Sequence, residues 1–231
     1  TIRKTGSGIQ EFIDYEISNA DSVYYIVTAL DRLHNESEGL AVSTNQSEYF
    51  PDVGMKYSWA VDAIDMLYDR GVIKGDQNGT YNPGVNTKRG DFTIMIVKAL
   101  GFEAEFTDNF SDVKPGSYYY DAIGVARELG IVKGDGNNFN PDSNITREDM
   151  MVIVVNALNK AGAMIEKADE KYLDNYSDAK NISNYAREAV ALLTAKGIVN
   201  GFEGRINPKG MATRAEIAVV FANVLNKIEF M

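Results

Sequence analysis

The chain has 231 residues, 45% of them hydrophobic, and a formal net charge of −10 at pH 7. This length supports one or two domains with a buried core, and the acidic balance argues against nucleic acid or an anionic membrane as the main partner, because both need a basic face. With no cysteine and one histidine, the sequence also leaves almost no room for zinc sites, thiol nucleophiles or Ser-His-Asp triads.

The N-terminal segment has the periodicity of β-strands. Side chains alternate in the stretch SVYYIVTALDR, with Val23, Tyr25 and Val27 on one face, and a polar turn with a solvated His34 precedes the short run LAVST. Residues 1–47 resemble the last two strands of a fibronectin type III domain, which implies a truncated neighbouring domain. The chain has no signal peptide and no run of 18 apolar residues. We therefore expect no membrane insertion and, since the first residue is not Met, a fragment whose export signal lay upstream.

Three similar units follow, and a fixed series of motifs indicates a repeat architecture. Each unit opens with an aromatic-x-Asp motif (YFPDV, NFSDV or NYSDA) and continues through an aromatic and alanine-rich segment to Gly-Ile/Val-Val/Ile-x-Gly and then Asn-Pro. An arginine stands six residues after each proline, and these arginines are Arg89, Arg147 and Arg214. We expect the repeats to span residues 48–107, 108–173 and 174–231.

Each repeat has the pattern helix, loop, helix. In the third repeat Ala186, Ala189, Val190 and Leu193 form one apolar stripe, and Gly197 stands where a helix C-terminal glycine is expected. The second helices, with runs such as MMVIVVNAL and IAVVFANVL, are too hydrophobic to have a wet face and should be buried between neighbours. The sequence therefore predicts a mainly α fold, a bundle of three helix-loop-helix units around a pseudo-threefold axis, with a short N-terminal β segment.

The glycine-rich loops between the helices do not fit a calcium site or a nucleotide loop. The sixth position of a calcium loop requires glycine but holds Tyr81 in the first copy, and the twelfth requires glutamate but holds Thr87 or Thr146. The third copy has Phe202 in place of the first aspartate. No Gly-x-x-x-x-Gly-Lys-Ser/Thr string occurs, so the glycines are expected to serve tight turns, and no metal or cofactor is expected.

The string TRAE at the start of the last helix is a capping box. The hydroxyl of Thr213 is expected to accept from a free backbone N–H, while Glu216 reaches back to the start of the helix. Thr146 and Asp149 form the same pattern with a shorter acid. These four residues therefore have a structural role whether or not they bind a ligand.

The arginine in this motif is not explained by capping. A cation in the first turn of a helix is disfavoured by roughly 0.3–1 kcal/mol, yet all three repeats have one there. An external anion would explain it, since free N–H groups attract the same anion. The alternative is an ion pair between repeats, to an acid such as Asp52 or Asp112.

Taken together, these motifs resemble S-layer homology domains from residue 48 to the C-terminus. Residues 213–216 match the family's Thr-Arg-Ala-Glu motif in full and residues 146–149 match it closely, whereas residues 88–91 depart from it at the first and third positions. The resemblance implies an intrachain pseudo-trimer, in a monomer, whose inter-repeat grooves bind the secondary polysaccharide of Gram-positive cell walls. The ligand it implies is the ketal-pyruvate of terminal pyruvylated N-acetylmannosamine, outside the cell at the cell wall or S-layer.

On this interpretation each arginine offers its planar fork to the pyruvyl carboxylate, an acid two residues later fixes the helix start, and glycine loops let the backbone approach the sugar. Trp59 and Tyr120 have rings that could stack on a sugar, although core packing is favoured for both. The predicted ligand-binding residues are Arg89, Arg147, Arg214, Lys88, Thr146, Thr213, Asp91, Asp149, Glu216, Gly75, Gly134, Gly201 and Trp59.

Two other functions stay open at the level of the sequence. The chain could be a fragment of a cell-surface glycoside hydrolase whose catalytic part lies upstream, because such repeats usually tether another domain. It could also anchor a self-assembling S-layer subunit. Since the chain has 33 acidic residues and no motif selects one pair of carboxylates, we expect no catalysis by this chain itself.

Overall fold

The computed structural model describes residues 24–27, 40–43, 46–163 and 168–229, and the chain divides into two units, Thr1–Asn45 and Gln46–Met231. In the first unit β1 (Tyr24–Val27) pairs antiparallel with β2 (Leu40–Ser43). This confirms the two strands for these residues. The predicted turn with His34 lies outside the described residues, and the resemblance to a fibronectin type III domain stays a prediction.

The second unit is helical, as predicted. Its α-helices come in three pairs, one pair for each repeat, and short 3₁₀ helices precede the first helix in repeats 1 and 3. The elements are η1 (Met55–Ala60), α1 (Val61–Asp69), α2 (Arg89–Ala99), α3 (Tyr120–Glu128), α4 (Arg147–Lys160), η2 (Glu170–Asn175), η3 (Ala179–Asn181), α5 (Arg187–Ala195) and α6 (Arg214–Glu229).

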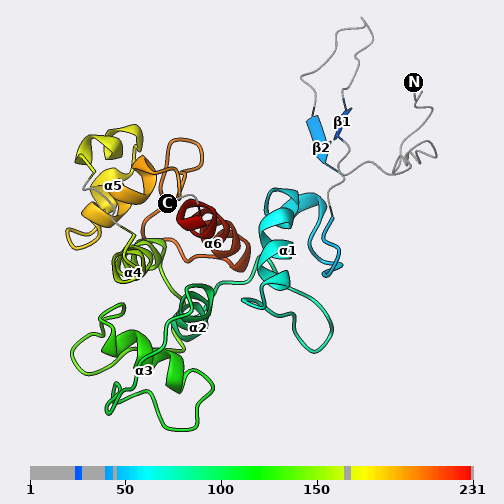
Figure 1. The fold of residues 1–231 in the computed structure, drawn as a ribbon. Helices are drawn as coiled ribbons and strands as arrows, with labels where there is room; N and C mark the ends of the chain where they lie inside the picture. Colours follow the sequence, from blue (N-terminus) through cyan, green and yellow to red (C-terminus); the bar gives the residue numbers. More distant parts are fainter. Residues whose placement is uncertain (1–23, 28–39, 44–45, 164–167, 230–231) are drawn as a thin grey trace, which may run out of the picture. The chain divides into compact units, whose positions relative to one another are not determined.

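The second helix of each repeat lies at the centre of this unit. Figure 1 shows α2, α4 and α6 side by side in the middle, with α1, α3 and α5 around them. Phe92 of α2 and Phe221 of α6 are fully buried and stack with ring centroids 5.4 Å apart. Burying each such ring contributes roughly 1.5–3 kcal/mol, which explains why the most hydrophobic segments occupy the shared core.

The first helix of each repeat covers this core with one apolar stripe. In α5 the side chains of Ala189, Val190 and Leu193 are buried, as their spacing predicts. The turn after the helix needs a left-handed residue, and Gly197 supplies it with φ 65°, as Gly71 does after α1 with φ 68°. Helices α1 and α5 therefore end just before Gly71 and Gly197, as the sequence predicts for Gly197.

Backbone hydrogen bonds link the repeats in a closed ring. The amide of Arg89 donates to Ser143 of repeat 2, Arg147 donates to Gly210 of repeat 3, and Arg214 donates back to Val85 of repeat 1. Each central helix thus begins against the Asn-Pro loop of the next repeat, and the last repeat closes on the first. This arrangement places all three arginines at boundaries between repeats.

Candidate functional site

The three arginines occupy equivalent positions, which we call the 1–2, 2–3 and 3–1 junctions after the repeats that meet there. In each junction the arginine Nε donates to a backbone carbonyl just before the Asn-Pro dipeptide of the next repeat. The distances are 3.1 Å from Arg89 to Phe139, 2.9 Å from Arg147 to Ile206 and 2.7 Å from Arg214 to Tyr81. One edge of every guanidinium is therefore used to hold two repeats together.

Two of the arginines also form an ion pair with the next repeat. Arg89 Nη1 lies 3.2 Å from Asp149, and Arg147 Nη1 lies 2.8 Å from Glu216. The alternative of an ion pair between repeats is thus confirmed for Arg89 and Arg147. The acids suggested for it, Asp52 and Asp112, are wrong. Asp52 and Asp112 instead accept from two successive backbone amides of their own repeat's loop, at 2.6–2.9 Å.

Arg214 differs from the other two. Within the described residues no carboxylate lies within 4 Å of its guanidinium, which sits 4.3 Å above the ring centroid of Tyr81 and donates from Nη2 to the carbonyl of Lys74 at 3.2 Å. The acid in the corresponding place, Asp91, accepts instead from the hydroxyl of Tyr118 at 2.8 Å. Nη1 of Arg214 has no described partner, so the charge at the 3–1 junction is not paired.

The helix starts follow the quality of the predicted caps. Thr213 and Glu216 form the capping box, with amide-to-side-chain distances of 2.8 and 3.3 Å, and the hydroxyl of Thr146 accepts from the amide of Asp149 at 3.2 Å. Lys88 provides no side-chain cap and pairs with Asp142 at 3.2 Å. Glu216 therefore serves both as a cap for its own helix and as an ion-pair partner of the preceding repeat.

The three loop glycines predicted to approach the sugar have a packing role in the structure. A Cβ atom at Gly75, Gly134 or Gly201 would lie 2.5–2.8 Å from the aromatic ring that opens the same repeat. The absence of a side chain thus lets the Phe50 ring or its counterpart cover the loop. Contact between these glycines and a ligand stays a prediction.

An exposed aromatic side chain stands at the same position in every repeat. Trp59 is 55% exposed, so the core packing favoured from the sequence is wrong for it. Its counterparts are Tyr118 and Tyr185, which are also exposed, and their hydroxyls donate to Asp91 and Asp149 of the preceding repeat. Sequence reasoning missed both tyrosines, although their alignment with Trp59 was the available signal.

Sequence reasoning likewise missed Glu148, which follows the arginine of repeat 2. Its side chain is only 3% exposed and accepts from the amide and hydroxyl of Ser183 at 3.0 and 2.9 Å and from the hydroxyl of Tyr185 at 3.1 Å. It also pairs with the ammonium group of Lys209. Burial, the largest influence, acts to raise the pKa of Glu148, but Lys209, Ser183 and Tyr185 together outweigh it and hold the pKa below its usual value.

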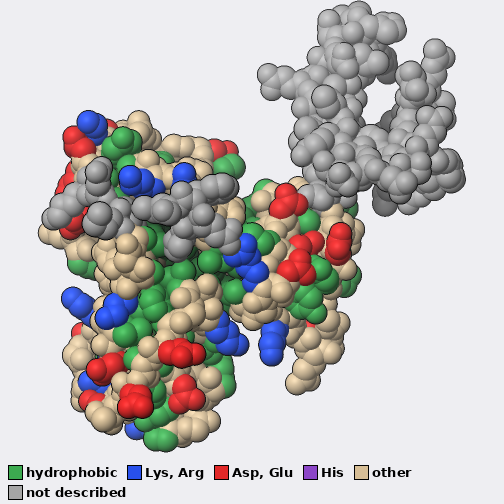
Figure 2. All heavy atoms as spheres, in the orientation of Figure 1, with side chains coloured by type: hydrophobic (Ala, Val, Ile, Leu, Met, Phe, Trp, Pro, Cys, Tyr) green, Lys and Arg blue, Asp and Glu red, His purple; other side chains and the backbone are tan. Residues whose placement is uncertain are grey.

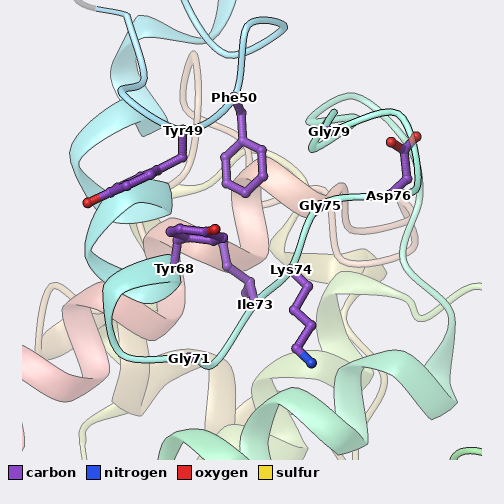
Figure 3. Close-up of a pocket in the computed structure, with 9 residues that line it drawn as sticks. All are labelled: Tyr49, Phe50, Tyr68, Gly71, Ile73, Lys74, Gly75, Asp76 and Gly79. Carbon is purple, nitrogen blue, oxygen red and sulfur yellow. The ribbon is translucent and has the colours of Figure 1, made fainter.

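A pocket of about 380 Å³ lies on repeat 1 beside the 3–1 junction. Figure 3 shows the rings of Tyr49, Phe50 and Tyr68 gathered on one side of it, whereas the side chain of Lys74 points away from them. Lys74 is the residue whose carbonyl accepts from Arg214, so the pocket and the unpaired arginine share one segment of chain.

Charged side chains are dispersed over the face of the molecule that Figure 2 shows. On the face in Figure 2, Lys and Arg side chains lie in separate places around a central apolar area instead of forming one basic patch. The part of the chain that the structure describes contains no group of three His, Cys, Asp or Glu side chains suited to a metal ion. None of its helices has the length and hydropathy that crossing a membrane requires.

Comparison with known proteins adds the family. The S-layer homology domain model matches residues 49–93, 109–151 and 175–218. Similar proteins include an amylopullulanase of Thermoanaerobacterium thermosulfurigenes (38% identity over 75% of this chain), the exoglucanase XynX of Acetivibrio thermocellus (37% over 79%) and the surface-layer 125 kDa protein of Lysinibacillus sphaericus (33% over 74%). The matched segments cover 9%, 17% and 14% of those three proteins.

Proposed function

This chain belongs to the S-layer homology domain family, and from that premise we propose that it anchors a surface protein to the cell wall by binding a pyruvylated secondary wall polysaccharide. It works outside the cell, at the cell wall, without catalysis. The three repeats act as an intrachain pseudo-trimer in a monomeric protein. The observation that carries the proposal is the unpaired guanidinium of Arg214.

The chemistry of Arg214 suits a carboxylate. Its Nε and one hydrogen of Nη2 are used by the carbonyls of Tyr81 and Lys74, which leaves the edge formed by Nη1 and Nη2 to donate. A guanidinium edge binds a carboxylate through two parallel hydrogen bonds, which are about twice as strong as neutral ones. The ketal-pyruvate group provides such a carboxylate on a sugar ring.

The surroundings of Arg214 suit the sugar that would bear this carboxylate. The 3₁₀ helix η1, which carries the exposed Trp59, contacts α6, which begins at Arg214. An aromatic face binds the apolar face of a sugar, and its ring is rigid enough to lose little entropy in doing so. The other two arginines already have carboxylate partners, so binding at the 1–2 and 2–3 junctions requires the ligand to compete with Asp149 and Glu216.

Within the described residues, the pKa shifts that carboxyl groups show do not point to a catalytic acid. A glycosidase relies on a carboxyl group whose pKa is raised so that it holds a proton near neutral pH. The carboxyl groups that depart from their usual values here do so in the opposite direction: hydrogen bonds from Thr80 lower the pKa of Asp76 to about 2, and the pKa values of Glu148 and Asp169 are also lowered. The carboxylates of Asp91, Asp149 and Glu216 at the junctions accept hydrogen bonds from Tyr118, Arg89 and Arg147.

A second proposal concerns the whole protein. The names of two relatives, an amylopullulanase and an exoglucanase, describe enzymes of which the matched segments cover only 9% and 17%. A glycoside hydrolase upstream of the repeats is therefore one cargo that this anchor would carry, and an S-layer subunit is the other.

Sedimentation with purified wall polymer tests the anchoring proposal. We expect the wild-type protein to pellet with pyruvylated polymer and to stay in solution when the pyruvate has been removed chemically. Arg214→Ala should release the protein, whereas Arg205→Ala, which removes the same charge from an exposed loop position of the same repeat, should not. Equal binding to polymer with and without pyruvate would contradict the proposal, and release of reducing sugar would contradict anchoring without catalysis.

A further inference from the structure

The 2–3 junction contains a complete set of donors for a carboxylate, and a side chain of this chain already occupies it. Glu148 accepts from the Ser183 amide, the Ser183 hydroxyl, the Tyr185 hydroxyl and the Lys209 ammonium. All these donors belong to repeat 3, whereas Glu148 belongs to repeat 2. The carboxylate thus reaches across the junction as a ligand from a separate molecule would.

The equivalent positions in the other junctions show that this occupant is a peculiarity of repeat 2. The residue that follows the arginine is Gly90 in repeat 1 and Ala215 in repeat 3, and neither has a side chain that could reach the next repeat. The position of Lys209, directly after the Asn-Pro dipeptide, is held by Asp142 in repeat 2 and Gly84 in repeat 1. An acid directly after the arginine and a lysine directly after the Asn-Pro dipeptide therefore occur together only at the 2–3 junction, whereas the lysine–acid pair of the 1–2 junction joins Lys88 to Asp142.

The 1–2 junction is filled by an aromatic ring instead of a carboxylate. Gly90 lies against the ring of Tyr119, where even a Cβ atom would come within 3.0 Å of the ring. Tyr119 is 9% exposed and takes the place that alanine holds in the other two repeats, as Ala60 and Ala186. The 3–1 junction, with Ala215 and Ala60, has neither the aromatic ring nor the internal carboxylate.

We infer that Glu148 is a built-in occupant of a carboxylate-binding site at the 2–3 junction, and that it keeps this junction from taking the acidic sugar of the wall. The inference rests on the proposed function for the identity of the external ligand. The site itself is defined by the donors of Ser183, Tyr185 and Lys209. Truncating Glu148 should leave these donors without an acceptor and open the site to a carboxylate from solution.

Chemical rescue with acetate tests the site without reference to any glycan. In sodium chloride Glu148→Ala should unfold at a lower temperature than the wild type, because the donors of Ser183, Tyr185 and Lys209 have lost their charged acceptor. Sodium acetate at the same ionic strength should raise the Tm of this variant by about 2–4 °C more than it raises that of the wild type, in which Arg214 is the junction arginine open to a carboxylate. Alanine is compatible with the backbone here, since Ala215 holds the same position fully buried in repeat 3.

Glu148→Gln is the matched control, because its amide keeps the volume and an acceptor oxygen, and acetate should change its Tm no more than it changes that of the wild type. If Glu148→Ala is unfolded in chloride, cooperative folding in acetate supports the inference and failure to fold in either salt overturns it. An equal response of Glu148→Ala and wild type to acetate also overturns it.

Calorimetric titration with a pyruvylated disaccharide then tests the role in wall binding. The Glu148→Ala variant should bind one more equivalent of the disaccharide than the wild type and Glu148→Gln do. An unchanged stoichiometry in a variant that acetate rescues would overturn the blocking role. If no variant and no wild-type protein binds the disaccharide, the proposed function fails, whereas the acetate result still decides whether Glu148 occupies a carboxylate site.

Discussion

The 2–3 and 3–1 junctions are built from the same motif, yet their charges are arranged in opposite ways. At the 2–3 junction Arg147 is 8% exposed and paired with Glu216, and Glu148 with Lys209 adds a second ion pair. At the 3–1 junction the partners of Arg214 among the described residues are two backbone carbonyls and an aromatic ring. The same repeated motif thus produces one junction whose charges are paired within the protein and one junction whose arginine is available to an external anion.

The largest effect is expected when the third repeat is separated from the other two, because this removes all junctions at once. Residues 174–231 alone should neither fold cooperatively nor bind wall polymer, because α6 begins against the carbonyls of Pro83 and Val85 of repeat 1 and a helical pair of this size buries too little core. Circular dichroism during heating and sedimentation with polymer check both points. A sharp unfolding transition with retained binding would show that the junctions are not needed.

Replacing each arginine by alanine should separate stability from binding. Arg147→Ala removes the buried partner of an ion pair whose acid, Glu216, is 33% exposed, so the free energy of unfolding should fall by about 1.5–3 kcal/mol. Arg214→Ala should lower the affinity for a pyruvylated disaccharide by about 1.5–3 kcal/mol, with a smaller loss of stability than Arg147→Ala because it breaks no ion pair, and Arg214→Lys should weaken binding nearly as much, because an ammonium lacks the fork. Denaturant unfolding and calorimetry measure the two quantities.

The opposite pattern, with Arg214→Ala strongly destabilising and Arg147→Ala only weakening binding, would reverse the roles of the two junctions. Arg89→Ala should lie between them in stability, because its ion pair with Asp149 is longer and its helix lacks a side-chain cap.

Lowering the pH should reduce the contribution of the 2–3 junction to the free energy of unfolding. The folded-state pKa of Glu148 is held below its ordinary value of 4.5, so its carboxylate contributes stability that is present above pH 4.5 and is lost as the pH falls through the folded-state pKa. The wild type should therefore exceed Glu148→Gln in unfolding free energy near pH 7, and this difference should shrink below about pH 4.5. A difference that is constant from pH 7 to pH 3 would exclude an ionised Glu148.

The smallest expected effect concerns the aromatic side chains. Trp59→Ala should weaken binding of the disaccharide by about 0.5–1.5 kcal/mol, because a stacking face is lost while the carboxylate contact stays. Tyr185→Phe, at the equivalent position of the 2–3 junction, should leave binding unchanged, since its hydroxyl serves Glu148 and Asp149. Equal losses for both variants in calorimetry would mean that the two junctions bind alike.

The fold was largely predictable, because apolar periodicity and repeated glycines mark helices and their ends wherever they occur. The capping box of Thr213 and Glu216 was predictable for the same reason, since both partners lie in one turn. The ion-pair partners of Arg89 and Arg147 were not, because they come from the next repeat, 60 and 69 residues away in the chain. The exposure of Trp59 also depends on this packing between repeats.

A crystal structure of the chain with a pyruvylated disaccharide tests the central claim most directly. The account predicts the sugar carboxylate within hydrogen-bond distance of Nη1 and Nη2 of Arg214, with Glu148 still bound to Ser183 and Lys209. A disaccharide bound at Arg147 with Glu148 displaced, and the 3–1 junction empty, would contradict it.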